Sequence, residues 1–176
     1  MKNYACDHPA GLPAGNRRGL LAQAVAEGTI AKGNEKILTS AFDFGDLKVR
    51  QIMTPRTQVD YLLVGQPIGD VLKLLKKSQY TRFPLCDGGL DKVIGWVPTK
   101  EFLAAYYAEG EVNVLRLLAR PPVFHPESVT LDRLLSSFHQ ERTEMVFVVD
   151  EYGGVEGIVT LQDVVDELLS ELGEPV

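Results

Sequence analysis

Cysteine and histidine are scarce in this chain, which has two cysteines and three histidines among 176 residues. Cys6 and Cys86 belong to no motif, and two such cysteines fit a reducing cytosol better than a disulfide scaffold. His8, His125 and His139 are far apart in the sequence and lack metal-ligand spacing. We therefore predict neither a disulfide framework nor a metal site.

Long apolar runs and basic clusters are also missing. No run approaches the roughly 18 residues that a membrane helix needs, and Met1-Lys-Asn-Tyr4 leads into polar, Pro- and Gly-rich sequence rather than a signal peptide. Lysines and arginines are scattered and the net charge is −6, so a nucleic-acid partner is disfavoured. No Gly-x-Ser-x-Gly or Cys/His nucleophile arrangement occurs. These absences favour a cytoplasmic protein that is not an enzyme.

What the chain does contain is one structural unit twice. Gly157-Ile-Val-Thr-Leu-Gln-Asp163 is similar to Gly95-Trp-Val-Pro-Thr-Lys-Glu101, and each follows an apolar strand pattern that ends in an aspartate, Asp87 or Asp150. The helix pattern before each strand keeps the spacing of these aspartates: Ile68, Val71, Leu72 and Leu75 match Leu131, Leu134, Leu135 and Phe138. A register shared through a helix and a strand indicates an internal repeat.

Each repeat has the predicted order β-α-β-β-α, so we expect an α/β (α+β) fold in which two tandem repeats pack as a pseudo-twofold module around one shared core. We assign residues 1–48 to a lead-in and N-terminal connector helices, 49–107 to the first repeat and 114–172 to the second. Expected helices cover 20–25, 34–44, 67–78, 99–107, 131–141 and 160–172, and expected strands cover 59–64, 83–86, 93–97, 123–124, 145–149 and 155–159. A loop is expected at 53–56, a linker at 109–111 and a poorly ordered lead-in at 1–16.

The motif Thr160-Leu-Gln-Asp163 lies where a strand leads into a helix. Its spacing is typical of a capping box, in which Thr160 caps the helix and a carboxylate three residues on reaches back to a backbone N–H. The same helix start offers unpaired N–H groups to a phosphate, while Asp163 could bind the two hydroxyls of a ribose. On spacing alone the capping box is favoured.

Four segments carry a family resemblance. They are Val49-Arg-Gln-Ile-Met-Thr-Pro-Arg56, Tyr80-Thr-Arg-Phe-Pro-Leu85, Val148-Val-Asp-Glu-Tyr-Gly-Gly154 and Gly157-Ile-Val-Thr-Leu-Gln-Asp-Val-Val-Asp-Glu-Leu168. Together they resemble a tandem CBS-domain pair, or Bateman module, and more narrowly the CorC/HlyC transport-associated family and the cyclin-M magnesium transporters. The resemblance covers about Lys36 to Leu172, and the motifs are specific together although each alone is weak.

The resemblance implies an adenine-nucleotide site, for ATP or AMP, in a cleft between the repeats. Thr160 would contact phosphate or ribose next to Ile158, and Asp163 would take the ribose hydroxyls. The adenine pocket would be lined from the first repeat, and Arg56 and Arg82 would be phosphate partners because a guanidinium is a planar fork of donors. The first-repeat lining residues are Thr54, Tyr80, Thr81, Arg82, Phe83 and Pro84. Core packing is the alternative for Tyr80, Phe83 and Pro84, and a solvated surface position for Arg56.

The equivalent cleft of the first repeat departs from this pattern. Pro98 stands where Thr160 stands and has neither a hydroxyl nor an N–H for a phosphate, and Glu101 replaces Asp163 with a side chain one methylene longer. Trp96 has the bulk to fill space there. We therefore predict one nucleotide site, not two.

The resemblance also implies a regulatory module that forms a homodimer through its CBS helices and is attached to a membrane domain for magnesium or cobalt transport. Exposed apolar residues such as Leu103 and Val165 are candidates for the dimer face. The alternative is a structural dimerisation module without a ligand. The acidic residues Glu151, Glu156, Asp163, Asp166 and Glu167 are by default a solvated face, and a second interpretation is that they bind Mg²⁺ together with nucleotide phosphates.

Overall fold

The computed structural model describes residues 19, 23–27, 32–109 and 114–173. The predicted lead-in at 1–16 lies outside these residues. Of the helix predicted at 20–25, the described part is helical at residues 23–25 and the helix continues to 26. The helix predicted at 34–44 is confirmed and is longer, since α2 spans Lys32–Asp46.

The first repeat begins with a short helical turn and two very short strands. Its elements are α3 (Val49–Ile52), β1 (Thr54–Pro55), the 3-10 helix η1 (Arg56–Gln58), β2 (Leu62–Leu63), α4 (Ile68–Lys77), β3 (Arg82–Cys86), β4 (Val93–Pro98) and α5 (Thr99–Glu109). The predicted strand at 59–64 is reduced to β2, because only Leu62 and Leu63 pair with β3. The loop predicted at 53–56 contains β1 and the start of η1.

The second repeat has the same order of elements except that it lacks counterparts of β1 and η1. Its elements are α6 (Val114–Leu118), β5 (Phe124–Pro126), α7 (Leu131–Glu141), β6 (Met145–Val149), β7 (Val155–Thr160) and α8 (Leu161–Gly173). The bounds predicted for α7 and β6 are confirmed, whereas α6 was not predicted. The linker predicted at 109–111 overlaps the end of α5. A register shift between Leu85 and Cys86 recurs between Val148 and Val149, which supports two copies of one unit.

One strand of the first repeat belongs to the sheet of the second. One sheet has the order β2-β3-β4, and the other has the order β1-β7-β6-β5, so β1 from the start of the first repeat completes the sheet of the second. Thr54 pairs there with Ile158. The first repeat receives a matching contact, an isolated bridge between Trp96 of β4 and Arg120. The repeats are therefore linked through backbone pairing as well as through side chains.

The expectation of one shared core is wrong, because each repeat buries its own helices. The cluster of the first repeat includes Val71, Phe83 and Phe102, and that of the second includes Leu134 and Val159. A third, smaller cluster joins the repeats through one residue of β4 and residues of β6 and β7: Trp96, Met145, Phe147 and Val155. Each sheet is thus covered by its own helices on one side, and the repeats meet through this smaller cluster.

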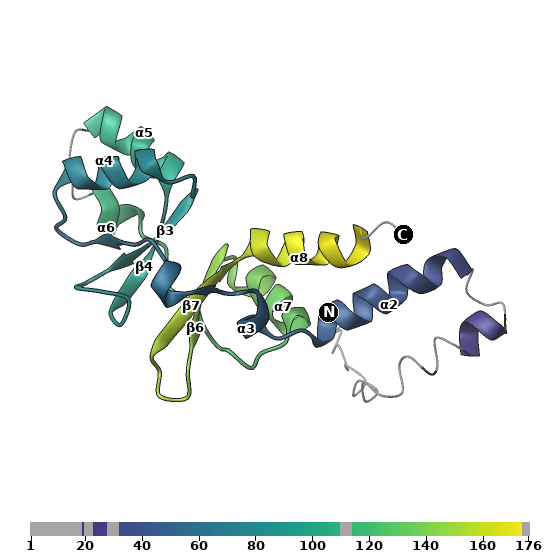
Figure 1. The fold of residues 1–176 in the computed structure, drawn as a ribbon. Coiled ribbons are helices and arrows are strands. Elements are labelled where there is room, and N and C mark those ends of the chain that lie inside the picture. Colours follow the sequence, from purple (N-terminus) through teal and green to yellow (C-terminus); the bar gives the residue numbers. More distant parts are fainter. Residues whose placement is uncertain (1–18, 20–22, 28–31, 110–113, 174–176) are drawn as a thin grey trace, which may run out of the picture.

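Helix α2 packs on the second repeat. It contacts α8 and α7, and Phe44 near its end is 5% exposed within the cluster of that repeat. Figure 1 shows α2 beyond the second repeat, at the end of the molecule away from the first repeat. Among the described residues, no helix is long and apolar enough to cross a membrane.

Cys86, at the end of β3, is completely buried, and burial raises the pKa of its thiol to about 12. Because the thiolate is the reactive form, Cys86 should be inert in the folded protein. In a Cys6→Ser variant, which leaves Cys86 as the only cysteine, we expect alkylation at pH 8 only when denaturant unfolds the chain. Mass spectrometry of the labelled protein measures this, and rapid labelling without denaturant would contradict the buried position.

Candidate functional site

A cleft of about 370 Å³ lies between the two repeats, a volume in the range of small-molecule sites. Its walls come from β1 and η1, from the segment before β3, and from β6, β7 and the first turn of α8. We call it the nucleotide cleft, after the ligand that the sequence resemblance implies. Seven of the predicted site residues line it: Thr54, Tyr80, Thr81, Arg82, Ile158, Thr160 and Asp163.

Three of the predicted site residues do not line the nucleotide cleft. Phe83 and Pro84 are buried inside β3, where Phe83 belongs to the core of the first repeat. Arg56 on η1 forms an ion pair with Asp91, with 3.2 Å between Nη2 and Oδ1. Phe83 and Pro84 therefore have the core-packing role that was the alternative for them. Arg56 lies at the surface, paired with a carboxylate.

Thr160 and Asp163 form the helix cap that their spacing predicts. The Asp163 Oδ2 atom accepts hydrogen bonds from the Thr160 backbone N–H at 2.7 Å and from the Thr160 hydroxyl at 2.8 Å. The hydroxyl oxygen of Thr160 in turn accepts from the Asp163 N–H at 3.3 Å. Because these contacts use Oδ2, the cap leaves Oδ1 outside its hydrogen bonds, and the capping role is compatible with a hydroxyl ligand.

The apolar part of the cleft suits a flat ring. Val59, Met145 and Ile158 supply its apolar surface. Tyr80 stands at the cleft with 56% of its surface exposed, and its ring packs edge-on against Phe83 at 6.1 Å between centroids. An exposed aromatic face of this kind gains stacking energy when a planar base covers it.

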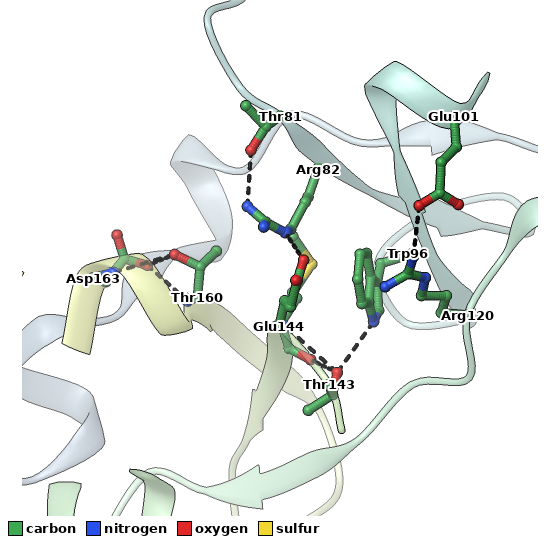
Figure 2. Close-up of polar contacts among 10 residues, drawn as sticks. Thr81, Arg82, Trp96, Glu101, Arg120, Thr143, Glu144, Thr160 and Asp163 are labelled. Atoms are coloured by element: carbon green, nitrogen blue, oxygen red, sulfur yellow. Dashed lines mark hydrogen bonds and ion pairs between the residues drawn. The ribbon is translucent and has the colours of Figure 1, made fainter. Parts of the chain in front are cut away.

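The charged part of the cleft holds more acid than base. Asp60 and Asp163 line it, and Arg82 is the only lysine or arginine among its described lining residues. The Arg82 Nε atom lies 2.6 Å from Oε2 of Glu144, and its Nη1 donates to the Thr81 hydroxyl at 2.9 Å. Figure 2 shows Arg82 and Glu144 between the Thr160–Asp163 cap and the group of Trp96, Arg120 and Glu101.

The corresponding region of the first repeat is filled by side chains of the chain itself. Trp96 is completely buried, and its indole N–H donates to the Thr143 hydroxyl at 3.2 Å. The guanidinium of Arg120 lies over the Trp96 ring, 4.9 Å from the centroid, and binds Glu101 at 2.6 Å. Glu101, the counterpart of Asp163, is therefore already paired, and a planar cation occupies the ring face (Figure 2).

Sequence reasoning missed six lining residues: Gln58, Val59, Asp60, Gln79, Met145 and Gln162. Gln79 and Gln162 are next to predicted positions, so a wider window around each motif would have included them. Met145 pairs with Thr160 across β6 and β7, a position that strand register could have indicated. No sequence motif includes the remaining three, Gln58, Val59 and Asp60, because their position at the cleft depends on the 3-10 helix η1.

No group of three or more His, Cys, Asp or Glu side chains in the described part of the chain is arranged to hold a metal ion. The acidic residues near α8 therefore form no ready cation site by themselves. Asp163 is engaged in the helix cap, and Asp166 accepts a hydrogen bond from Gln162 at 2.7 Å.

A comparison with protein-family models decides the family. The model described as "CBS domain" matches residues 49–108 and again residues 114–170. The chain belongs to the CBS domain family. The prediction of a tandem CBS pair like those of CorC-type proteins is thereby confirmed, as is the α/β fold of two tandem repeats.

Individual relatives place this CBS pair among CorC-type sequences. The magnesium and cobalt efflux protein CorC of Salmonella typhimurium is 32% identical over 143 residues, which cover 81% of this chain and 49% of CorC. The chain spans less than half the length of the curated relatives it matches.

Solved structures agree with this placement. The CBS domain of a bacterial CNNM/CorC family Mg²⁺ transporter in complex with ATP matches with a TM-score of 0.70 and 31% identity, over 78% of this chain and 97% of the other. A CBS-domain pair with bound AMP from Klebsiella pneumoniae matches with a TM-score of 0.63 and 26% identity, over 70% and 98%.

Proposed function

We propose that this CBS pair is a regulatory module that binds one adenine nucleotide, ATP or AMP, in the nucleotide cleft. The observation that carries the proposal is the cleft itself, in which seven residues predicted from sequence lie together around apolar walls. Tyr80 offers a ring face to the base, and Asp163 offers Oδ1 to ribose hydroxyls. The Thr160 hydroxyl, which donates to Asp163 in the structure, would turn to a phosphate at the start of α8 when the ligand binds. The matched structures with ATP and with AMP support this ligand class.

One site per chain is the stoichiometry we propose. The nucleotide cleft is open, while its counterpart is filled by Trp96 and closed by the Arg120–Glu101 pair. Arg56 takes no part in this arrangement, because it is paired with Asp91. Mg²⁺ would enter only with nucleotide phosphates, whose charge it would offset beside Asp60 and Asp163.

The regulated partner in this proposal is a membrane domain of a longer CorC-like protein that transports magnesium or cobalt, with the CBS pair on its cytosolic side. The support is the similarity to CorC, of which the chain covers about half. Ligand binding at the start of α8 would change the relative angle of the repeats, and α2, which packs on α8, would carry that change toward the membrane domain. The ligand can shift this equilibrium only by its difference in affinity for the two states.

A homodimer formed through CBS helices is the second proposal, and it is also the basis of the alternative function as a structural module. Val165 and Leu169 on α8 are 37% and 59% exposed. Leu103, the other candidate for this face, is half-buried against the core of the first repeat. Dimers that form equally well with and without nucleotide, in a protein that binds none, would favour the structural alternative.

The proposed function is tested by thermal unfolding and calorimetry with AMP, ADP and ATP, each with and without Mg²⁺. A ligand at a hundredfold excess over its dissociation constant should add about 2.7 kcal/mol to the free energy of unfolding. For a chain of this size that corresponds to a rise in Tm of about 5–10 °C. Binding of one nucleotide per chain is the expected result, and no shift with any of the three would refute the sensor function. Recovery of the nucleotide unchanged excludes hydrolysis.

A further inference from the structure

The contact between Arg82 and Glu144 has a consequence for which ligands the nucleotide cleft accepts. Arg82 lies on β3 of the first repeat, and Glu144 directly precedes β6 of the second. Matching hydrogen bonds hold the backbone at both places: Thr99 N–H donates to the carbonyl of Thr81, the residue before Arg82, at 2.9 Å, and Leu161 N–H donates to the carbonyl of Glu144 at 3.1 Å. The two side chains, 29% and 41% exposed, meet across the boundary between the repeats.

This pair changes the charge that a ligand meets. Asp60 and Asp163 line the cleft, and Glu144 contacts Arg82, the only lysine or arginine among the described lining residues, so three carboxylates and one guanidinium lie at or beside the cleft. The formal charge of the group is −2. A phosphate that approaches Arg82 therefore meets a cation already neutralised by Glu144, in a cleft that two further carboxylates line. A base and ribose carry no charge and meet no such opposition.

We propose that Glu144 is a specificity-determining residue that competes with ligand phosphate for Arg82. The proposal rests on the proposed function, because it concerns how the same cleft ranks adenine compounds. The cleft then recognises the adenosine part of its ligand, and a phosphate group adds little affinity unless Glu144 is displaced or a divalent cation accompanies the phosphate. Specificity arises here from an unfavourable element inside the site as well as from its favourable contacts.

The geometry also allows a test that separates competition from positioning. A guanidinium has five N–H groups, and Arg82 uses one at Nε for Glu144 and one at Nη1 for Thr81. The remaining N–H groups can bind a phosphate. If Glu144 only oriented Arg82, its loss would weaken phosphate binding, whereas loss of a competitor strengthens it.

The experiment measures dissociation constants of adenosine and AMP by calorimetry for the full chain and for the variants Glu144→Gln, Arg82→Gln and the double variant. We expect the wild-type protein to bind both compounds with similar affinity. Glu144→Gln should bind AMP about five- to tenfold more tightly with adenosine unchanged, since one charge near the phosphate is removed. The double variant should lose this gain. Glu151→Gln, which removes the same charge from the exposed turn between β6 and β7, serves as the control.

The outcomes distinguish this inference from the proposed function. An unchanged ratio of AMP to adenosine affinity in Glu144→Gln, or weaker AMP binding, overturns the competition while the nucleotide site stands. Binding of neither compound by any variant overturns both. If only Glu144→Gln binds AMP, Glu144 competes with the phosphate strongly enough to prevent AMP binding in the wild-type protein. A gain of the same size in Glu151→Gln assigns the effect to net charge and overturns the role of Glu144.

Discussion

Replacement of Asp163 by alanine should abolish most of the affinity for adenine nucleotides while the fold remains intact. Hydrogen bonds to a charged group contribute about 1.5–3 kcal/mol each, so loss of both ribose contacts should raise the dissociation constant of AMP by about 100-fold or more. The variant also loses the acceptor of the helix cap, whose hydrogen bonds from Thr160 measure 2.7 and 2.8 Å. We expect that loss to cost about 1 kcal/mol of stability. Calorimetry with AMP, performed well below the Tm, measures the first effect, and thermal unfolding the second.

Two controls separate the ribose contact from the cap. Asp70→Ala removes another carboxylate from the first turn of a helix, α4, away from the nucleotide cleft, and should leave AMP binding unchanged. A ligand without ribose hydroxyls, 2′,3′-dideoxyadenosine monophosphate, should bind the wild-type protein as weakly as AMP binds Asp163→Ala. If Asp163→Ala still discriminates between the two ligands, Asp163 does not bind the ribose.

The elements with regular apolar periods could be predicted from the sequence. α7 agrees with its predicted bounds because Leu131, Leu134 and Phe138 recur at helical spacing and all become buried. β6 agrees because a continuous apolar run is covered on both faces. In contrast, α6 is five residues long, too short for a period to show, and β2 depends on pairing with β3 rather than on its own composition.

Site residues that belong to a local sequence motif could be predicted, whereas the ion-pair partners of site residues, which depend on tertiary contacts, could not. Thr160 and Asp163 are in one helix turn, so their spacing alone indicates how they lie. The partners of the two arginines come from far along the chain, Asp91 for Arg56 and Glu144 for Arg82. No local sequence pattern predicts ion pairs between residues so far apart in the chain. Because of these ion pairs, however, Arg56 is held outside the cleft, and the charge of Arg82 in the cleft is partly neutralised.

Gly157→Ala should weaken both the fold and the nucleotide cleft. A Cβ atom at this position would lie 2.4 Å from the backbone oxygen of Thr54, and backbone cannot yield as a flexible side chain can. β1 must then move away from β7, which breaks the pairing of Thr54 with Ile158, two residues that line the cleft. We expect a loss of about 1–3 kcal/mol of stability by analogy with overpacked cores, together with about tenfold weaker AMP binding. Thermal unfolding and calorimetry measure the two effects.

The repeat provides the matched comparison for this prediction. Gly95 is the counterpart of Gly157, and a Cβ atom there would lie 2.1 Å from the backbone oxygen of Arg120. Gly95→Ala should therefore cost a similar amount of stability, but it acts on the filled side of the module and should leave AMP affinity nearly unchanged. Gly69→Ala, on α4 with no atom within 4 Å of the added carbon, should not destabilise the protein, because alanine favours a helix. Equal loss of AMP affinity in the Gly95 and Gly157 variants would show that general destabilisation, and not the position of β1, sets binding in the cleft.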